Sequence, residues 1–78
     1  MKPTKVSAQT IDERGKPCPL PIIALARALK AHGEVELVAD DPAVRADLLS
    51  YCEATGSTLV SLTAQGAVIT ARIRRKSG

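Results

Sequence analysis

Three prolines constrain the fold of this chain more than any other feature. Pro17, Pro19 and Pro21 alternate around Cys18 in the stretch 14–21, which reads Arg-Gly-Lys-Pro-Cys-Pro-Leu-Pro. A proline has no backbone N–H and is tolerated in a helix only in the first turn, so a helix can begin here but cannot run through. The pattern therefore predicts a junction between a strand and a helix, with Cys18 as the N-cap and Pro19 as the first helical residue.

Cys18 is an unusual residue for a helix N-cap, where Ser, Thr, Asp or Asn would normally accept a hydrogen bond from the first turn. The positive end of a helix dipole favours the thiolate, which is the reactive form of cysteine. Arg14 and Lys16 would strengthen this effect, while Asp12 and Glu13 would oppose it. We therefore expect the pKa of the Cys18 thiol to be lowered. The alternative is that Cys18 is a small apolar residue packed under a turn. The residues predicted to shape its loop are Gly15, Pro19 and Pro21.

A lone, exposed thiolate suits the attack on a sulfur atom that is already activated on another protein, by analogy with thiol–disulfide exchange. The chain has one histidine, His32, which is predicted at the far end of the same helix, so a cysteine–histidine dyad within the chain is excluded. There is also no second cysteine at the spacing of a thioredoxin-like motif. We therefore expect a sulfurtransferase that acts as a carrier.

A family signature surrounds Cys18. Ile11-Asp12 and Gly15 precede Cys18-Pro19-Leu20-Pro21, and Asp40-Asp41-Pro42, Tyr51-Cys52 and Gly56 follow in the second half. Over nearly its whole length the chain thus resembles the TusA/SirA family of small sulfur-carrier proteins, whose signature is Cys-Pro-x-Pro. Tyr51 stands where tryptophan is common in that family, and the segment after Gly56 lacks the family's more typical aromatic residue; both departures concern packing.

The resemblance implies a function and partners. It implies that Cys18 accepts sulfur as a persulfide from a cysteine desulfurase or a rhodanese-like protein and passes it to a downstream relay protein. The pathways implied are tRNA thiolation, molybdenum cofactor assembly and sulfur oxidation. The alternative is a regulatory or RNA-binding module without chemistry. No cofactor is expected.

Hydrophobic periodicity predicts alternating strands and helices. The predicted order is strand 5–12, helix 19–32, strand 34–39, helix 42–55, and strands 58–64 and 67–75. Gly33 is expected to end the first helix in a left-handed conformation, Asp41 to cap the second helix and Gly56 to end it, with a turn at Gln65-Gly66. This βαβαββ order predicts an α/β two-layer sandwich, with both helices on one face of a four-stranded mixed sheet. The resemblance implies the same fold.

The predicted core is aliphatic, because Tyr51 is the sole aromatic residue. In the helices, the apolar stripes are Ile22, Leu25, Ala26 and Leu29, and Val44, Leu48, Leu49 and Cys52. In the strands, the residues expected to face the helices are Val35, Leu37, Ala39, Ile69, Ala71 and Ile73, with Thr70, Arg72 and Arg74 facing outward. Cys52 is interpreted as a core residue. The alternative is that Cys52 is a resolving cysteine that forms a disulfide with Cys18, which would need the two Cα atoms to lie within about 7 Å of each other.

Length and composition restrict the remaining possibilities. Seventy-eight residues predict a single domain over 1–78, and two cysteines with one histidine are too few for a disulfide framework or a structural zinc site. The uncharged apolar run at 17–26 is about half of the roughly 20 residues that cross a bilayer. No secretory signal is recognised. These features favour a reducing, cytoplasmic setting and no membrane partner.

The charge is mildly positive, at +3. Arg14 and Lys16 are predicted to dock acidic patches of partner proteins, and a second basic group lies at 72–76. RNA recognition on a sheet normally uses exposed aromatic residues, so direct nucleic-acid binding is the weaker alternative.

Overall fold

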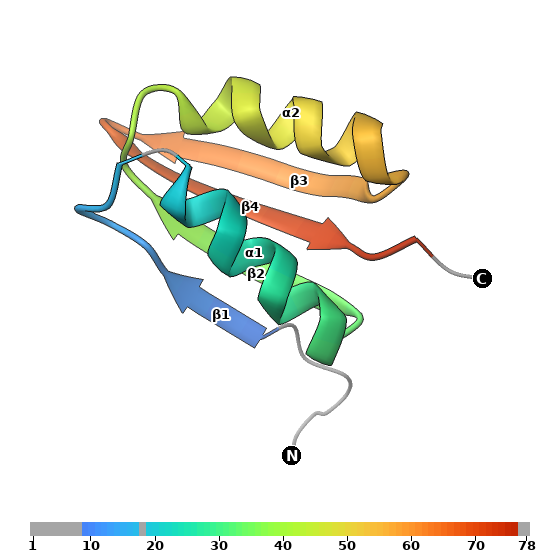
Figure 1. Ribbon diagram of the computed structural model, residues 1–78. Coiled ribbons are helices and arrows are strands. Elements are labelled where there is room, and N and C mark those ends of the chain that lie inside the picture. The colour runs from blue at the N-terminus through green and yellow to red at the C-terminus, as the bar shows by residue number, and fades with distance from the viewer. Residues whose placement is uncertain (1–8, 18, 77–78) are drawn as a thin grey trace, which may run out of the picture.

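The computed structural model describes residues 9–17 and 19–76, and within them it has the predicted order of elements. These elements are β1 (Gln9–Asp12), α1 (Leu20–Ala31), β2 (Glu34–Ala39), α2 (Val44–Thr55), β3 (Thr58–Gln65) and β4 (Val68–Arg74) (Figure 1). Residues 5–8 of the predicted first strand lie outside the described residues. In the described part of the chain, neither helix is long and apolar enough to cross a membrane.

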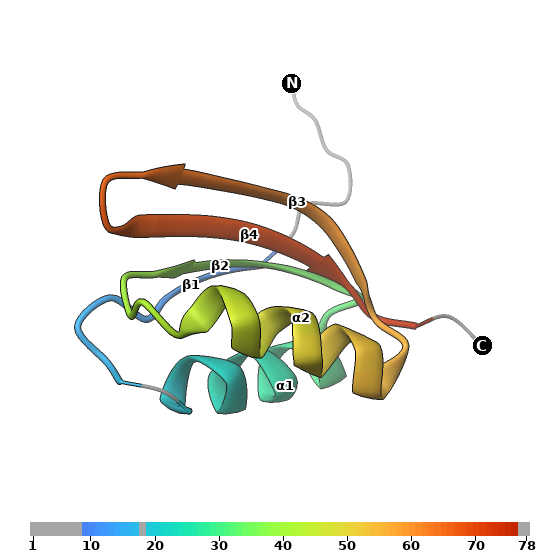
Figure 2. The same cartoon turned by 90° about the horizontal axis from the view of Figure 1, so that it is seen from above.

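The four strands form one mixed sheet in the order β1-β2-β4-β3. β1 and β2 are parallel, as expected for strands joined through a helix, and the other neighbours are antiparallel. Both helices cover the same face of the sheet (Figure 2). This arrangement confirms the predicted two-layer sandwich. It also places the carboxyl ends of β1 and β2 at the same edge of the sheet, where the loops that follow them meet.

The core lies between the helices and one face of the sheet, and it is aliphatic as predicted. Its buried residues are Leu25 and Leu29 from α1, Val44, Leu48 and Cys52 from α2, Val35, Leu37 and Ala39 from β2, and Ala71 and Ile73 from β4. Ile22 and Ile69 are partly buried against it. Leu49 was wrongly predicted to belong to the core: it is 53% exposed, because successive helical residues point about 100° apart and Leu48 takes the inward direction.

Helix α1 begins one residue later than predicted. Its N-cap is Pro19, whose carbonyl accepts the first i→i−4 bond from Ile23 N–H at 3.0 Å, so the prediction of Cys18 as N-cap is wrong. The helix ends at Ala31, and its C-cap, His32, has an extended backbone with φ −129°. The prediction of a left-handed Gly33 is also wrong. The φ of Gly33 is not positive, because the chain continues from the extended His32 directly into β2.

A distant side chain caps the end of α1. Arg75 Nη1 donates to the carbonyl oxygens of Leu29 and Lys30, at 3.2 Å each, and its backbone N–H donates to Gly33 O at 2.8 Å. A guanidinium at this position satisfies carbonyls that have no partner within the helix and complements the negative end of the dipole. The segment after β4 therefore substitutes for the missing glycine cap.

We expect Arg75→Ala to lower the free energy of unfolding by about 1 kcal/mol, because two helix-terminal carbonyls lose a charged donor while the backbone bond to Gly33 remains. Arg75→Lys keeps the charge and should lose less. Urea unfolding followed by circular dichroism measures both variants, and an unchanged midpoint in Arg75→Ala would show that solvent replaces the guanidinium without cost.

Helix α2 also begins later than predicted. Its N-cap is Ala43 rather than Asp41, and Asp41 instead closes the turn before the helix: its Oδ1 accepts the Ala43 N–H at 2.8 Å and its carbonyl accepts the Val44 N–H at 3.0 Å. Pro42 lies inside this turn. Gly56 ends the helix with φ +76°, which confirms the predicted left-handed cap.

The hairpin between β3 and β4 turns one residue later than predicted. Gln65 pairs with Val68, so the loop is Gly66-Ala67 rather than Gln65-Gly66. Gly66 has φ +60°, the positive angle that glycine provides at the first loop position of a type II′ turn. Leu59 pairs with Ile73 but Ser61 pairs with Arg72, so the register between β3 and β4 shifts by one residue. The edge strand β3 therefore contains an irregularity at this point.

Candidate functional site

The loop between β1 and α1, residues 13–19, carries most of the residues that the sequence analysis selected. Arg14, Gly15, Lys16 and Pro19 lie within the described part of this loop. Cys18 lies outside the described residues, so the expectations for its side chain stay predictions. The site is therefore built from the residues on either side of it.

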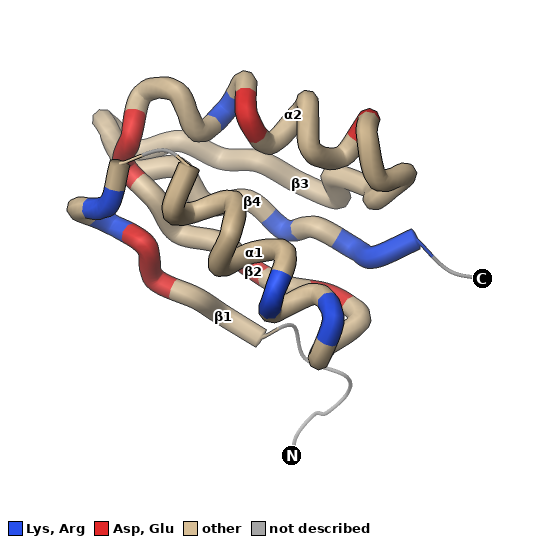
Figure 3. The backbone as a smooth tube through the Cα atoms, viewed as in Figure 1, with Lys and Arg blue, Asp and Glu red and all other residues tan. Residues whose placement is uncertain are grey.

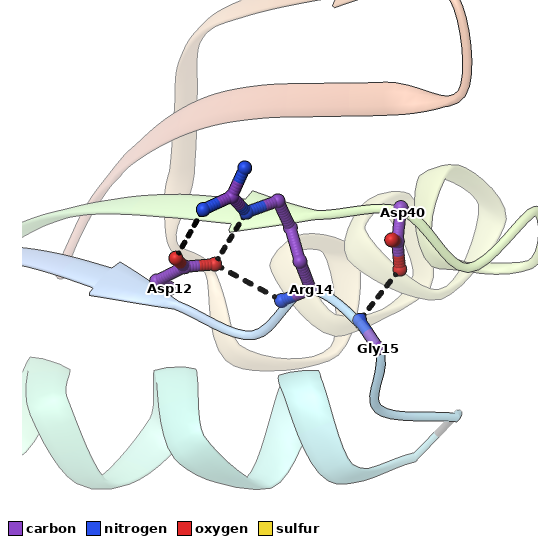
Figure 4. Close-up of polar contacts among 4 residues, drawn as sticks. All are labelled: Asp12, Arg14, Gly15 and Asp40. Atoms are coloured by element: carbon purple, nitrogen blue, oxygen red, sulfur yellow. Dashed lines mark hydrogen bonds and ion pairs between the residues drawn. The ribbon is translucent and has the colours of Figure 1, made fainter.

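Arg14 is held by Asp12 at the start of the loop. Its Nε donates to Asp12 Oδ1 at 2.9 Å, its Nη2 to Oδ2 at 2.8 Å and its backbone N–H to Oδ1 at 3.1 Å (Figure 4). These hydrogen bonds lower the pKa of Asp12 to about 2, the bonds from the side chain having the larger effect, and they raise the pKa of Arg14. The pair is thus fully charged at neutral pH. Because both side chains are more than half exposed, it orients the loop more than it stabilises the fold.

Lys16 is paired in the same way with Glu13. Its Nζ lies 3.3 Å from Glu13 Oε2, and the Glu13 side chain is only 11% exposed. The Glu13 N–H donates to Val38 O at 2.7 Å, which extends the pairing of β1 with β2 by one residue. Glu13 was predicted only to oppose a thiolate at Cys18, and this structural role was missed. Glu13 and Lys16 are the first and fourth residues of a turn in which the Lys16 N–H donates to Glu13 O at 3.3 Å, and Gly15 at the third position of that turn is the signal that could have indicated the pair.

The two pairs change the electrostatic prediction for this loop. Arg14 and Lys16 each face a carboxylate, so the four charged residues at 12–16 sum to zero. Figure 3 shows the acidic segment of β1 running directly into the basic residues of the loop. The cations therefore contribute less to a thiolate at position 18 than their number suggests.

Gly15, between the two cations, connects the loop to another strand. Its φ is +82°, and its N–H donates to Asp40 Oδ1 at 2.9 Å (Figure 4). Asp40 directly follows β2, at the sheet edge where β1 also ends. In the sequence, Asp40 stands out only as part of the family resemblance. Its position after a strand that runs parallel to β1 is the signal that could have placed it beside the loop.

The first turn of α1 uses its own hydrogen-bond donors. Leu20 N–H donates to Pro17 O at 2.9 Å and Ile22 N–H donates to Pro19 O at 3.1 Å. Pro21, the second residue of the helix, has no N–H and is buried against the core. The described first turn therefore leaves no free backbone donor for an anion, and only its dipole remains to attract one.

An apolar groove lies at the start of α1, between the two helices. It has a volume of about 350 Å³ and is lined by Pro19 and Ile22 from α1 and by Asp47, Ser50 and Tyr51 from α2. Leu20 and Ile23, on the first turns of α1, are each 46% exposed. The apolar surface next to the loop is thus larger than the sequence indicated, because the apolar stripe predicted for this helix did not include them.

Cys52 is buried in the core at 8% exposure, which confirms its structural interpretation. Burial raises the pKa of its thiol, so the thiol stays protonated at neutral pH and is a poor nucleophile. A role as resolving cysteine would depend on Cys18, which lies outside the described residues.

The outward face of the sheet does not provide a simple basic surface. Arg72 lies 3.5 Å from Glu34 and 3.9 Å from Glu36, and Arg74 lies 3.3 Å from Glu34. Tyr51 lies on α2, so no aromatic side chain of the described strands is available to stack a base. The same part of the chain contains no cluster of three or more His, Cys, Asp or Glu side chains that could hold a metal ion.

Comparisons with known proteins extend over the whole described fold. A sequence model of the family described as sulfurtransferase TusA matches residues 9–75. A candidate sulfur carrier protein of Neisseria meningitidis serogroup A is 31% identical over 74 residues, covering 91% of this chain and 100% of the relative. The sulfur carrier protein TusA of Pseudomonas entomophila is 31% identical over 71 residues, covering 87% and 89%. The solved structure of a SirA-like protein from Desulfitobacterium hafniense aligns with a TM-score of 0.73 and 28% identity, over 83% of this chain and 93% of that chain.

Proposed function

We propose that this chain, which belongs to the sulfurtransferase TusA family, carries sulfur as a persulfide on Cys18. The observation that carries the proposal is the family match over residues 9–75, which includes the whole loop between β1 and α1. The relatives are named as sulfur carriers. The described geometry supports the proposal, because position 18 directly precedes the Pro19 cap of α1, where the dipole favours a thiolate.

The proposed step is a displacement at sulfur. The thiolate of Cys18 attacks the outer sulfur of a donor persulfide, a new S–S bond forms to Cys18 Sγ, and the donor's own S–S bond breaks. The electron pair of that bond leaves with the donor sulfur, which becomes a thiolate, while the transferred sulfur keeps its proton. No external oxidant or reductant is needed. Delivery to an acceptor thiolate is the same displacement, with the Cys18 persulfide as the donor.

Two features beside Cys18 support docking of partner proteins. The first is apolar: Leu20 and Ile23 on the first turns of α1 are each 46% exposed, and an apolar groove lies between α1 and α2. The second is charged: the Arg14 and Lys16 side chains are 55% and 51% exposed although each is paired with a carboxylate. We propose that the donor is a cysteine desulfurase or a rhodanese-like protein and that the acceptor is a downstream relay protein in the cytoplasm, acting in tRNA thiolation, molybdenum cofactor assembly or sulfur oxidation.

Arg14→Ala is expected to raise the donor concentration needed for half-maximal loading by about three- to fivefold, since a partly exposed charge at an interface acts mainly on association. Loading by inorganic polysulfide is the matched control, because a small reagent needs no docking surface. An equal rise in the concentration of polysulfide needed for half-maximal loading would show that Arg14 acts on the loop and not on the partner.

The proposed function is tested by intact-mass spectrometry of the reduced chain after incubation with a cysteine desulfurase and cysteine. The expected result is a gain of one sulfur atom that dithiothreitol reverses, with the Cys18→Ser chain as control. No gain with the desulfurase, a rhodanese or polysulfide would exclude the carrier function. A regulatory module would then be the better interpretation, or an RNA-binding module if RNA bound in a salt-sensitive way.

A further inference from the structure

The carboxylate of Asp40 connects two segments that are distant in sequence. Its Oδ1 accepts the N–H of Gly15 at 2.9 Å, across a separation of 25 residues (Figure 4). Gly15 lies three residues before Cys18. The bond therefore connects the end of β2 with the loop that contains Cys18, the residue proposed to carry sulfur.

The β2 side of this connection is rigidly placed. β2 is an interior strand, paired with β1 on one side and with β4 on the other. Ala39, immediately before Asp40, is 1% exposed and pairs with Ile69. Asp41, immediately after it, closes the turn into α2. Asp40 thus lies between two fixed segments, and a loop bound to it takes its position from the sheet.

The loop side requires glycine for its conformation rather than for space. A Cβ at position 15 would meet nothing within 4 Å, but φ is +82°, in the left-handed region that other residues rarely adopt. This conformation accompanies the Gly15 N–H bond to Asp40. The flanking Arg14 and Lys16 are held by Asp12 and Glu13, from the β1 side of the loop. Contacts from two adjacent strands therefore fix consecutive residues of the loop.

We propose that Asp40 is a positioning residue for sulfur transfer: by bonding Gly15 to the sheet it holds the Cys18 loop in one geometry for a protein partner. The inference rests on the proposed function. Displacement between two proteins requires the attacking, transferred and leaving sulfurs to lie in line, so a loop that samples many conformations reacts slowly. A small reagent can approach from any direction and depends little on this order.

The hydrogen bond and the negative charge of Asp40 are separated by two variants. Asp40→Ala removes both, whereas Asp40→Asn removes the charge but keeps a side-chain oxygen that can accept the Gly15 N–H. Arg75→Ala is the matched control, because it removes two hydrogen bonds at the opposite end of α1. If Asp40→Ala does not fold, Asp40→Ser provides a second truncation.

The variants are compared by the rate of sulfur loading from a cysteine desulfurase charged with cysteine. We expect Asp40→Ala to load about tenfold more slowly than the wild type, and Asp40→Asn and Arg75→Ala to load within about twofold of it. Alkylation by iodoacetamide should change less than threefold in all variants. Hydrogen exchange of the Gly15 amide, followed by NMR, should accelerate in Asp40→Ala and stay slow in Arg75→Ala.

Each failure has its own signature. A wild-type chain that gains no sulfur refutes the proposed function. A wild-type chain that loads normally, beside an Asp40→Ala chain that loads at the same rate, refutes the positioning role alone. If Asp40→Asn and Asp40→Ala load equally slowly, the effect belongs to the charge of Asp40 and not to the hydrogen bond. If the Gly15 amide exchanges at the same rate in Asp40→Ala as in the wild type, the bond does not hold the loop. Either result overturns the inference.

Discussion

Replacing Cys18 with serine is expected to abolish sulfur loading, whereas replacing Cys52 with alanine should leave one sulfur per chain. The two thiols are predicted to differ in reactivity. Position 18 directly precedes the Pro19 cap of α1 in the sequence, and we predict that the helix dipole favours a thiolate there. Cys52 is 8% exposed on the inner side of α2, and its burial raises the pKa of the thiol. A serine hydroxyl at position 18 is not an effective nucleophile toward a persulfide at neutral pH.

The comparison is made by intact-mass spectrometry of the wild type and both variants after loading, followed by peptide mapping of the added sulfur. Cys52→Ala removes a buried side chain and should lower stability by about 1–2 kcal/mol, so folding is verified first by circular dichroism. Sulfur on the Cys18→Ser chain would assign the carrier to Cys52. A Cys52→Ala chain that folds but gains no sulfur would instead show that both cysteines are needed, as a resolving cysteine would require.

The architecture could be predicted from the sequence because local periodicity and the core agree. Val35, Leu37 and Ala39 alternate along β2 and all face the helices, and Ala71 and Ile73 do the same on β4. Because β1 and β2 are joined through a helix, they pair in parallel. Because β3 and β4 are joined by a short turn, they pair antiparallel. Few other topologies remain for so short a chain.

The ends of the helices could not be predicted in the same way, because tertiary contacts fix them. Gly33 looked like a C-cap, but Arg75, 42 positions further along the sequence, satisfies the last carbonyls of α1 and lets the chain continue in an extended conformation. Asp41 has the right residue type for an N-cap, yet it closes a turn that begins the helix two residues later than expected. In both cases the residue has a local preference that another hydrogen bond overrides.

The junction that carries the candidate site was predicted, but the contacts around it were not. The prolines indicated a junction at the start of α1, and the structure has one there. The pairing of Arg14 with Asp12 and of Lys16 with Glu13 was not predicted, because the sequence analysis treated the four charges as independent. The bond from Gly15 to Asp40 joins residues 25 apart and depends on β1 and β2 being neighbours, so it follows only from the folded sheet.

Leu48→Ala is expected to destabilise the chain severely, while the adjacent Leu49→Ala should have almost no effect. Leu48 is fully buried in the core and Leu49 is 53% exposed on the same helix. A buried leucine truncated to alanine costs about 3–4 kcal/mol, from lost transfer free energy and the cavity left behind. A fold of 78 residues typically has roughly 4–12 kcal/mol of stability, so one such loss removes much of it.

Thermal unfolding followed by circular dichroism measures the pair. We expect the midpoint of Leu48→Ala to fall by roughly 15–25 °C, or the chain to be unfolded at room temperature, and that of Leu49→Ala to move by less than about 4 °C. The substitutions are chemically identical and one residue apart on α2, so helix propensity cannot explain a difference between them. Equal losses would contradict the orientation of α2 on the sheet, and with it the groove that α2 forms with α1 at Pro19 and Ile22.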